Sequence, residues 1–278
     1  MVTTAEKAKK LVLEKIPAFP PIVMKILDLL GGDGVEIADL VELISTDAVF
    51  AAQVLKFANS PLFGLRSQVA TVKQAVVTLG LSRVEGLAMT VATSNYLKAA
   101  LTTAELYGCW RHMLATAVIS RELALTCSVP EDLAYTAGLL HDIGRLGLLV
   151  AYPHEYAAAL KAADRESLGL LDREKSAFGM DHCEAGRYLV EEWRLPEAFQ
   201  IVTGRHHDRT FGGAFDLLHV VHYACTLADA LGYFVVKPLQ QASLSEIHEA
   251  LPPGARQKFP ADFETLHQTV VEAVAAGS

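Results

Sequence analysis

GLLHDIGRLGLL, residues 138–149, sets an imidazole and a carboxylate side by side within an otherwise apolar segment. Burying a carboxylate without a partner carries a large free-energy penalty, so we expect a cation, a hydrogen-bond donor or a metal ion beside Asp142. A neutral His141 is a natural metal ligand, and the two side chains could share one ion. More histidines flank the pair along the chain, namely His112 upstream and His182, His206 and His207 downstream.

The composition indicates a folded protein without a membrane or nucleic-acid partner. With 51% hydrophobic and 20% charged residues over 278 positions, the chain can build a large core. The formal net charge is -8 and no basic patch interrupts it, so we expect no nucleic-acid binding. The four cysteines are dispersed, with no Cys-x-x-Cys pair, which suits a reducing compartment. No signal-peptide pattern and no run of ~20 apolar residues occurs, so we expect a cytoplasmic location.

Helical periodicity dominates the whole sequence, and no strand pattern of period two appears. The class is therefore predicted to be all-α. Pro21 suits the first turn of a helix, and Asp47 and Asp181 are predicted N-caps. Helices are expected over residues 5–16, 21–30, 37–44, 48–59, 71–79, 84–97, 106–126, 131–150, 153–163, 168–177, 182–193 and 215–231, with a shorter one reaching His206 and two short ones in the last forty residues.

Several motifs share their order with one known family. They are the proline pair at 20–21, the helix after Asp47, the ANSP turn at 58–61, AVVTLG at 75–80, GMDHCEAG at 179–186 and WRLP at 193–196. Together with the His-Asp pair, they resemble the HDOD domain, a branch of the HD superfamily of metal-dependent phosphohydrolases. The resemblance covers residues 16–232. It implies an HD-like multi-helix bundle over 102–232 and a smaller N-terminal sub-bundle over 16–101. Residues 233–278 lie outside the resemblance and are expected to form a C-terminal helical extension.

The resemblance also implies a set of metal ligands. In the HD superfamily a histidine, the His-Asp pair and a later aspartate hold one ion, and HD-GYP relatives add histidines for a second. By position, the first set is His112, His141 and Asp142, and the second is His182, His206 and His207. Asp142 would bridge the two ions. The expected cofactor is one or two divalent ions, with iron and manganese as candidates.

Two positions depart from the HD pattern. Cys225 stands at the expected position of the final aspartate, and Asp229 follows one helical turn later, so either is a possible additional ligand. Arg145 stands where HD-GYP proteins carry a lysine thought to contact substrate phosphate, which makes it the candidate phosphate-binding residue. Both departures argue against ordinary HD catalysis.

The resemblance favours a regulatory function, because HDOD proteins have often lost ligands and are regarded as non-catalytic. We expect a bacterial signal-transduction protein that binds a protein partner or a small signalling ligand with little or no turnover. One alternative is a metal-dependent phosphohydrolase acting on nucleotides or cyclic dinucleotides, and another is an apo scaffold with relic histidines. Leu62 and Phe63 follow the ANSP turn. They are expected to pack between the sub-bundles rather than form an exposed docking site.

Overall fold

The described part of the chain is helical and contains no strand. The computed structural model describes residues 21–32, 34–61, 63–65, 67–100, 104–163, 169–208, 214–237 and 241–277; the helix expected over 5–16 lies outside them. The helices are α2 (Pro21–Leu30), α3 (Ile37–Ser45), α4 (Ala48–Ala58), α5 (Val72–Leu79), α6 (Leu81–Ala100), α7 (Ala104–Ala124), α8 (Glu131–Leu140), α9 (Ile143–Ala151), α10 (Pro153–Ala163), α11 (Leu170–Phe178), α12 (His182–Glu192), α13 (Glu197–Arg205), α14 (Leu217–Ala230), α15 (Leu244–Ala250), α16 (Pro253–Lys258) and α17 (Phe263–Gly277).

Local capping explains where several of these helices begin. The side chain of Asp47 accepts from the backbone N–H groups of Val49 and Phe50, each at 3.0 Å, and so starts α4 as predicted. Asp181 starts α12 with a capping box, in which its carboxylate and that of Glu184 each accept from the other residue's backbone N–H. The predicted helix starts at Asp47 and Asp181 are therefore confirmed.

The helix predicted over residues 131–150 is wrong in one respect, because the chain breaks within it. α8 ends at Leu140 and α9 begins at Ile143, with Asp142 at φ −105° and ψ 17° between them. Gly144 gives the physical reason for the break. A Cβ at that position would lie 2.0 Å from the carbonyl oxygen of His182 and 2.5 Å from the backbone nitrogen of Gly186. The redirected α9 can therefore cross α12 at backbone contact distance.

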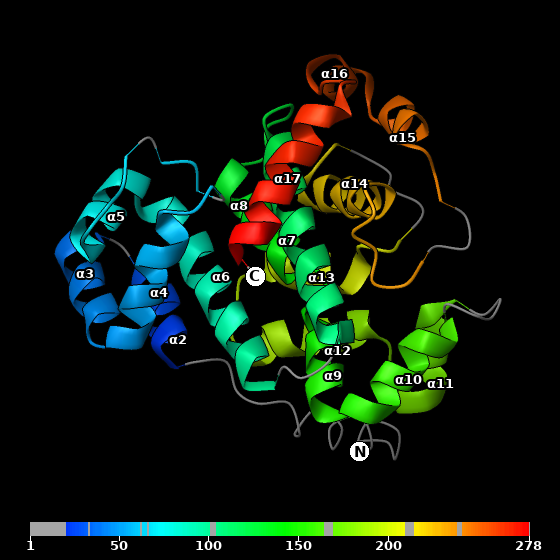
Figure 1. Cartoon of the computed structure of the whole chain (residues 1–278), viewed down its shortest axis with the longest axis horizontal. Coiled ribbons are helices and arrows are strands. Elements are labelled where there is room, and N and C mark those ends of the chain that lie inside the picture. Colours follow the sequence, from blue (N-terminus) through cyan, green and yellow to red (C-terminus); the bar gives the residue numbers. More distant parts are fainter. Residues whose placement is uncertain are drawn as a thin grey trace.

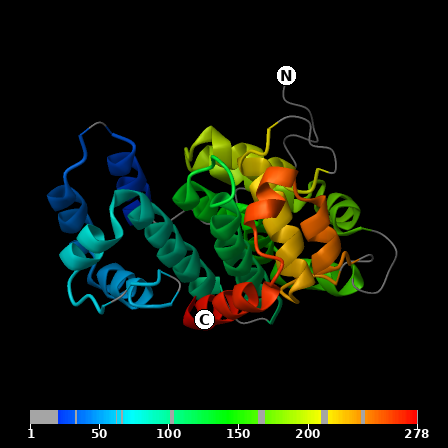
Figure 2. The same ribbon diagram turned by 90° about the horizontal axis from the view of Figure 1, so that it is seen from above.

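The molecule has a small N-terminal lobe joined to a larger helical body through α6 (Figures 1 and 2). α2, α4 and α5 pack against one side of α6, and α8 packs against α6 from the larger body. α7 runs through the middle of that body, where α8, α14 and α17 surround it. The order of a smaller N-terminal bundle followed by a larger one agrees with the expected architecture.

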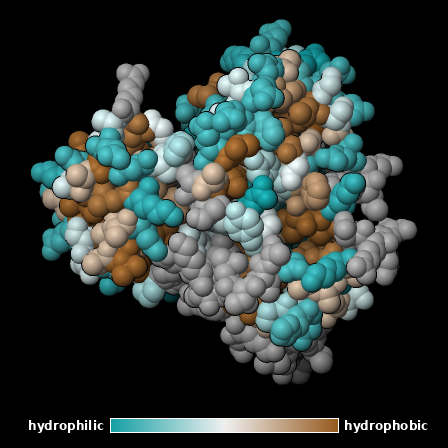
Figure 3. Space-filling model, in the orientation of Figure 1, coloured by the Kyte–Doolittle hydropathy of each residue, from teal (hydrophilic) through white to brown (hydrophobic). Residues whose placement is uncertain are grey.

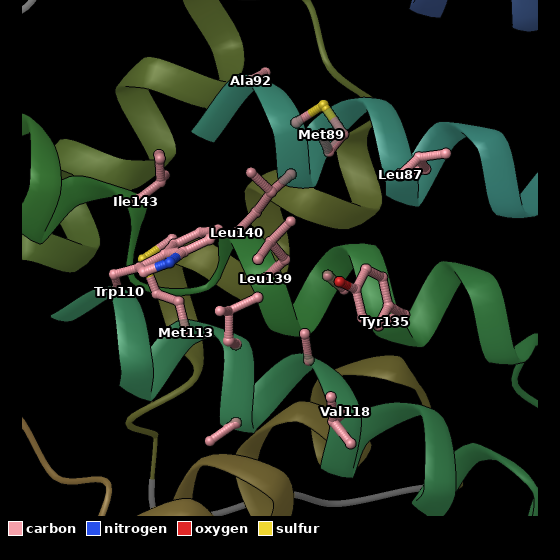
Figure 4. Packing of buried hydrophobic residues seen from close by; sticks show 14 of the residues in the cluster. Leu87, Met89, Ala92, Trp110, Met113, Val118, Tyr135, Leu139, Leu140 and Ile143 are labelled. Carbon is pink, nitrogen blue, oxygen red and sulfur yellow. The ribbon is translucent and has the colours of Figure 1, made fainter. Parts of the chain in front are cut away.

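The buried apolar side chains form one continuous cluster that extends from Val23 in α2 to Val274 in α17. Figure 4 shows part of it, where Leu140 of α8 lies between Met89 of α6 and Met113 of α7. Trp110 and Trp193 belong to this cluster, as expected of core anchors. Because the core is shared, the lobe and the body stabilise each other.

The turn after α4 is fixed by side-chain bonds to the backbone. The Asn59 amide accepts from the Val69 N–H and donates to the Val69 carbonyl, each at 2.8 Å. Phe63 is 4% exposed, and its ring centroid lies 6.0 Å from that of Tyr135 on α8. The packed arrangement predicted for this turn is therefore confirmed for Phe63, whereas Leu62 lies outside the described residues.

The C-terminal extension is more ordered than the two short helices expected from its sequence. α15 and α16 are short, but α17 spans fifteen residues and packs against α7. Leu266, Val270, Ala273 and Val274 recur at helical spacing and are buried. Prolines at 252, 253 and 260 led to the prediction of a loop and short helices in this segment. The apolar stripe that follows Pro260 indicates the long helix α17 better than the prolines indicate a loop.

In Figure 3, polar and apolar side chains are mixed over the coloured surface of both parts, and apolar ones form patches on the α2–α5 lobe. Ile37, Val49 and Val77 contribute to the exposed apolar surface of that lobe. None of the described helices combines the length and apolar character needed to cross a bilayer.

Candidate metal centre

Asp142 is the centre of the candidate site. It lies at the break between α8 and α9 and is fully buried. Its Oδ1 lies 3.3 Å from Nε2 of both His182 and His206. Its Oδ2 lies 3.7 Å from Nε2 of both His112 and His141. The two oxygens therefore face two separate pairs of imidazoles.

The structure brings the predicted histidines together from four segments of the chain. His112 comes from α7, His141 from the end of α8, His182 from the start of α12, and His206 and His207 from the end of α13. Convergence of this set on Asp142 was expected, and the distances agree with it.

The imidazoles are oriented by hydrogen bonds on their outer nitrogens. Nδ1 of His112 lies 2.8 Å from the Tyr233 carbonyl oxygen, and Nδ1 of His141 lies 2.7 Å from that of Gly138. Nδ1 of His206 lies 3.2 Å from the Thr203 carbonyl oxygen. Because a carbonyl only accepts, each Nδ1 carries the proton and each Nε2 presents a lone pair to the interior.

His182 is held by a carboxylate instead. Glu174 on α11 accepts from the backbone N–H of His182 at 2.8 Å and from its Nδ1 at 2.6 Å. The hydroxyl of Tyr156 donates to the other oxygen of Glu174. Burial and Arg145 would lower the pKa of His182, but Glu174, Cys183 and Asp142 outweigh them and raise it to about 10. Glu174 thus both orients this imidazole and increases its basicity.

Three other imidazoles, those of His141, His206 and His207, favour the neutral form. Burial lowers the pKa of His206 and holds the pKa values of His141 and His207 well below the usual histidine range. Burial would raise the pKa of Asp142, but Arg145 and the imidazoles of His141 and His182 hold it well below its usual range. The cluster therefore contains an ionised carboxylate beside the neutral imidazoles of His141, His206 and His207, whereas His182 must release a proton before it can bind a divalent cation.

Arg145 pairs with Asp142 rather than standing free. Its Nε lies 2.6 Å from Asp142 Oδ2, in an ion pair without a well-aligned hydrogen bond. Its Nη2 lies 3.5 Å from Nε2 of His207, which in turn is 3.1 Å from Nε2 of His182. The guanidinium is thus beside the cluster, as expected for a phosphate-binding residue, but its charge already has a buried partner.

Cys225 and Asp229, the two alternatives for an additional ligand, occupy different sides of His112. Sγ of Cys225 lies 3.5 Å from Nε2, the nitrogen that faces the cluster. Asp229 Oδ1 lies 3.4 Å from Nδ1, the nitrogen that faces away. The geometry therefore favours Cys225 as the ligand and gives Asp229 a role in orienting the His112 ring.

The donor atoms fall into groups that could hold a cation. One group contains His112, His141 and Cys225, another contains His141, Asp142 and His206, and a third contains His182, Cys183, His206 and His207; within each group the donor atoms lie within 4.8 Å of one another. Both oxygens of Asp142 and Nε2 of His206 are buried without an aligned hydrogen-bond partner among the described residues. Such atoms are costly to leave unpaired, so the residues fit one or two bound metal ions.

Three supporting groups were not predicted from the sequence. Glu174 and Tyr156 lie in ordinary helical patterns, and only their approach to His182 reveals their role. The Tyr233 carbonyl is a backbone group, which no residue pattern could indicate, and it lies one residue beyond the expected boundary at residue 232. The C-terminal extension therefore contributes directly to the site.

Comparison with known proteins identifies the family to which these features belong. The model of the HDOD domain family matches residues 16–209. A protein of Treponema pallidum is 27% identical over 200 residues, which span 70% of this chain but 38% of that relative.

Solved structures share the fold over nearly the whole chain. An HDOD domain protein from Geobacter sulfurreducens superimposes with a TM-score of 0.80 at 23% identity and covers 98% of this chain and 96% of its own. A candidate phosphohydrolase from Shewanella amazonensis SB2B has a TM-score of 0.73 at 22% identity, covering 96% and 98%. At these identities the likeness shows the fold, including the C-terminal helices.

Proposed function

Because the chain belongs to the HDOD family, we propose that it is a metal-binding regulatory protein of bacterial signal transduction with little or no catalytic turnover. The observation that carries this proposal is the ion pair of Arg145 with Asp142, at 2.6 Å, in the middle of the histidine cluster. Its partner would be a protein or a small signalling ligand, and its location would be the bacterial cytoplasm.

The ion pair argues against turnover because it engages both groups that phosphate chemistry would use. Asp142 is the carboxylate between the two imidazole pairs, and Arg145 is the candidate phosphate-binding residue. Both side chains are buried, so the pair must separate before Arg145 can contact a phosphate, and the Asp142 carboxylate then loses its buried cationic partner. The thiol of Cys225 further replaces a hard oxygen ligand with a soft one.

Metal binding is supported by the orientation of the imidazoles. Four Nε2 atoms face the two oxygens of Asp142, at 3.3–3.7 Å, and the opposite nitrogens of His112, His141, His182 and His206 contact carbonyls or a carboxylate. Partners of this kind accompany metal-binding histidines in general. Imidazole and carboxylate donors suit iron and manganese, which we propose for the half-site of His182, His206 and His207.

Phosphohydrolysis is the second candidate function. One specific observation favours it: a single carboxylate lies between two sets of imidazoles, as two-metal hydrolysis requires. The similarity to a candidate phosphohydrolase from Shewanella amazonensis SB2B agrees with it. Cleavage of a nucleotide or cyclic dinucleotide would then need Arg145 to leave Asp142 and contact phosphate.

Metal analysis and turnover assays on protein purified without an affinity tag distinguish these functions. We expect at least one equivalent of divalent metal, reduced in His182→Ala, and no hydrolysis of phosphodiesters or nucleotides. Cys225→Asp, which supplies a carboxylate at position 225, is the variant most able to gain turnover. Manganese- or iron-dependent hydrolysis by the unmodified protein would establish the enzyme instead. If the protein binds no divalent ion under any loading condition, the remaining function is that of a metal-free interaction scaffold.

A further inference from the structure

We propose that Cys225, His112, His141 and Asp142 form a four-coordinate thiolate site that selects zinc over manganese or magnesium. This inference rests on the metal binding proposed above and specifies the chemistry of one of its two half-sites. It makes the ion held there a structural one.

The separations among the two imidazoles and the thiol agree with the edges of a tetrahedron around zinc. Zinc bonds of about 2.0–2.1 Å to nitrogen and about 2.3 Å to sulfur place two nitrogens about 3.3–3.4 Å apart and nitrogen and sulfur about 3.5–3.6 Å apart. Here Nε2 of His112 lies 3.2 Å from Nε2 of His141 and 3.5 Å from Sγ of Cys225. Asp142 Oδ2 lies 3.7 Å from both nitrogens. A zinc ion therefore fits among His112, His141 and Cys225, and Asp142 completes the shell by moving toward it.

Asp142 can complete this shell while it remains paired with Arg145. A carboxylate oxygen has two lone pairs, so Oδ2 can accept from the guanidinium and bind an ion at once. Oδ1 then stays directed at His182 and His206. Asp229 does not compete for the position, because it faces Nδ1 of His112.

The ligand chemistry sets the preference among metals. Thiolate is a soft donor that favours zinc, whereas manganese and magnesium favour oxygen ligands. Four protein donors also fill a tetrahedral shell and leave no position for a reacting water, which is typical of structural zinc sites. The ion would join α7, the break between α8 and α9, and α14, the three segments that carry these ligands.

The decisive measurement is X-ray absorption at the zinc edge on full-length, untagged protein loaded with one equivalent of zinc. We expect one sulfur neighbour per zinc at about 2.3 Å. Cobalt(II) in place of zinc should give the sulfur-to-cobalt charge-transfer band and the intense visible bands of a tetrahedral ion. These readouts need no variant, so a folding defect cannot obscure them.

Variants then assign the sulfur. Cys225→Ser should remove the charge-transfer band and weaken zinc binding by at least the roughly 10–100-fold that loss of an outer-shell partner costs. Cys109→Ser, which removes a buried thiol of α7 outside the donor groups, is the matched control and should keep the band. Cys183→Ser should also keep it.

The alternative outcomes separate the two proposals. Bound zinc without a sulfur neighbour would overturn the thiolate site while leaving the metal-binding function intact. A band that disappears in Cys183→Ser but persists in Cys225→Ser would place the thiolate in the other half-site and equally overturn this inference. Protein that takes up no zinc, cobalt, iron or manganese would overturn both.

Discussion

At the scale of single residues, Glu174 is the strongest test of how the site is held. Glu174→Gln keeps the size of the side chain but removes the charge that faces His182. We expect the pKa of His182, now about 10, to fall in the metal-free protein. Burial and Arg145 then act against the charged imidazole, and the Asp142 carboxylate, at 3.3 Å, is farther from the ring than that of Glu174 at 2.6 Å. The free energy of unfolding should fall by ~3–5 kcal/mol, as when one partner of a buried pair is removed.

Histidine NMR titration and denaturant unfolding measure these two effects. Tyr156→Phe is the matched control, since it removes one hydrogen bond to Glu174 and retains the carboxylate. It should cost only about 1.5–3 kcal/mol and leave the pKa of His182 raised. Equal effects of the two substitutions on that pKa would show that charge is not the cause.

The candidate ligands could be predicted from the sequence, whereas the residues that orient them by hydrogen bonds could not. His112, His182, His206 and His207 could be assigned because their order around the His-Asp pair matches a family pattern. Glu174 could not, because a glutamate in an amphipathic helix is normally a solvated side chain, and only the fold shows it to be buried. The choice between Cys225 and Asp229 likewise depended on which side of the His112 ring each one faces.

At the scale of elements, the crossing of α9 and α12 is the feature most sensitive to substitution. Gly144→Ala would place a Cβ 2.0 Å from the His182 carbonyl oxygen, and both contacting atoms belong to backbones. We expect a loss of ~1–3 kcal/mol or more in the free energy of unfolding, because the helices must separate. Since His182 lies at this crossing, metal affinity should fall as well.

Gly108→Ala on α7 provides the matched control, because a Cβ there meets nothing within 4 Å. It should stabilise the protein by roughly 0.5–1 kcal/mol through helix propensity. Denaturant unfolding of both variants checks the comparison. If Gly144→Ala were as stable as the unmodified protein, the close crossing would be wrong.

Element positions followed well from periodicity and capping, but the break at His141-Asp142 did not. The apolar residues of 138–149 continue at helical spacing through the break, so the sequence shows no interruption there. What ends α8 is tertiary packing, namely the approach of α9 to α12 through Gly144. α17 is the opposite case. Its apolar stripe is visible in the sequence, but the nearby prolines led to the prediction of shorter helices.

At the scale of the whole molecule, Phe63 connects the N-terminal lobe to the body that carries the site. Its ring packs against Tyr135 of α8, and Nη2 of Arg83 on α6 donates to its carbonyl at 2.5 Å. Tyr135 also forms a hydrogen bond with Thr90 of α6, at 2.9 Å. α8 leads directly into His141 and Asp142, so a change in the site can alter the packing of the lobe.

Phe63→Ala should therefore reduce both the free energy of unfolding and the coupling between the metal site and the N-terminal lobe. Truncating a buried aromatic costs ~3–5 kcal/mol. With an unfolding entropy of about 2.1 cal/mol/K per residue, this cost lowers the melting temperature by roughly 5–9 °C if the chain unfolds as one unit. Val77→Ala, at a position 56% exposed on α5, is the control and should change the melting temperature little.

Hydrogen exchange with and without bound metal tests the communication itself. In the unmodified protein, metal should slow amide exchange around the site and also in α4 and α5, because Phe63 follows α4 and contacts α8. In Phe63→Ala the slowing should persist around the site and disappear from the lobe. An unchanged melting temperature, or lobe exchange that responds to metal equally in both proteins, would mean that Phe63 does not couple the two parts.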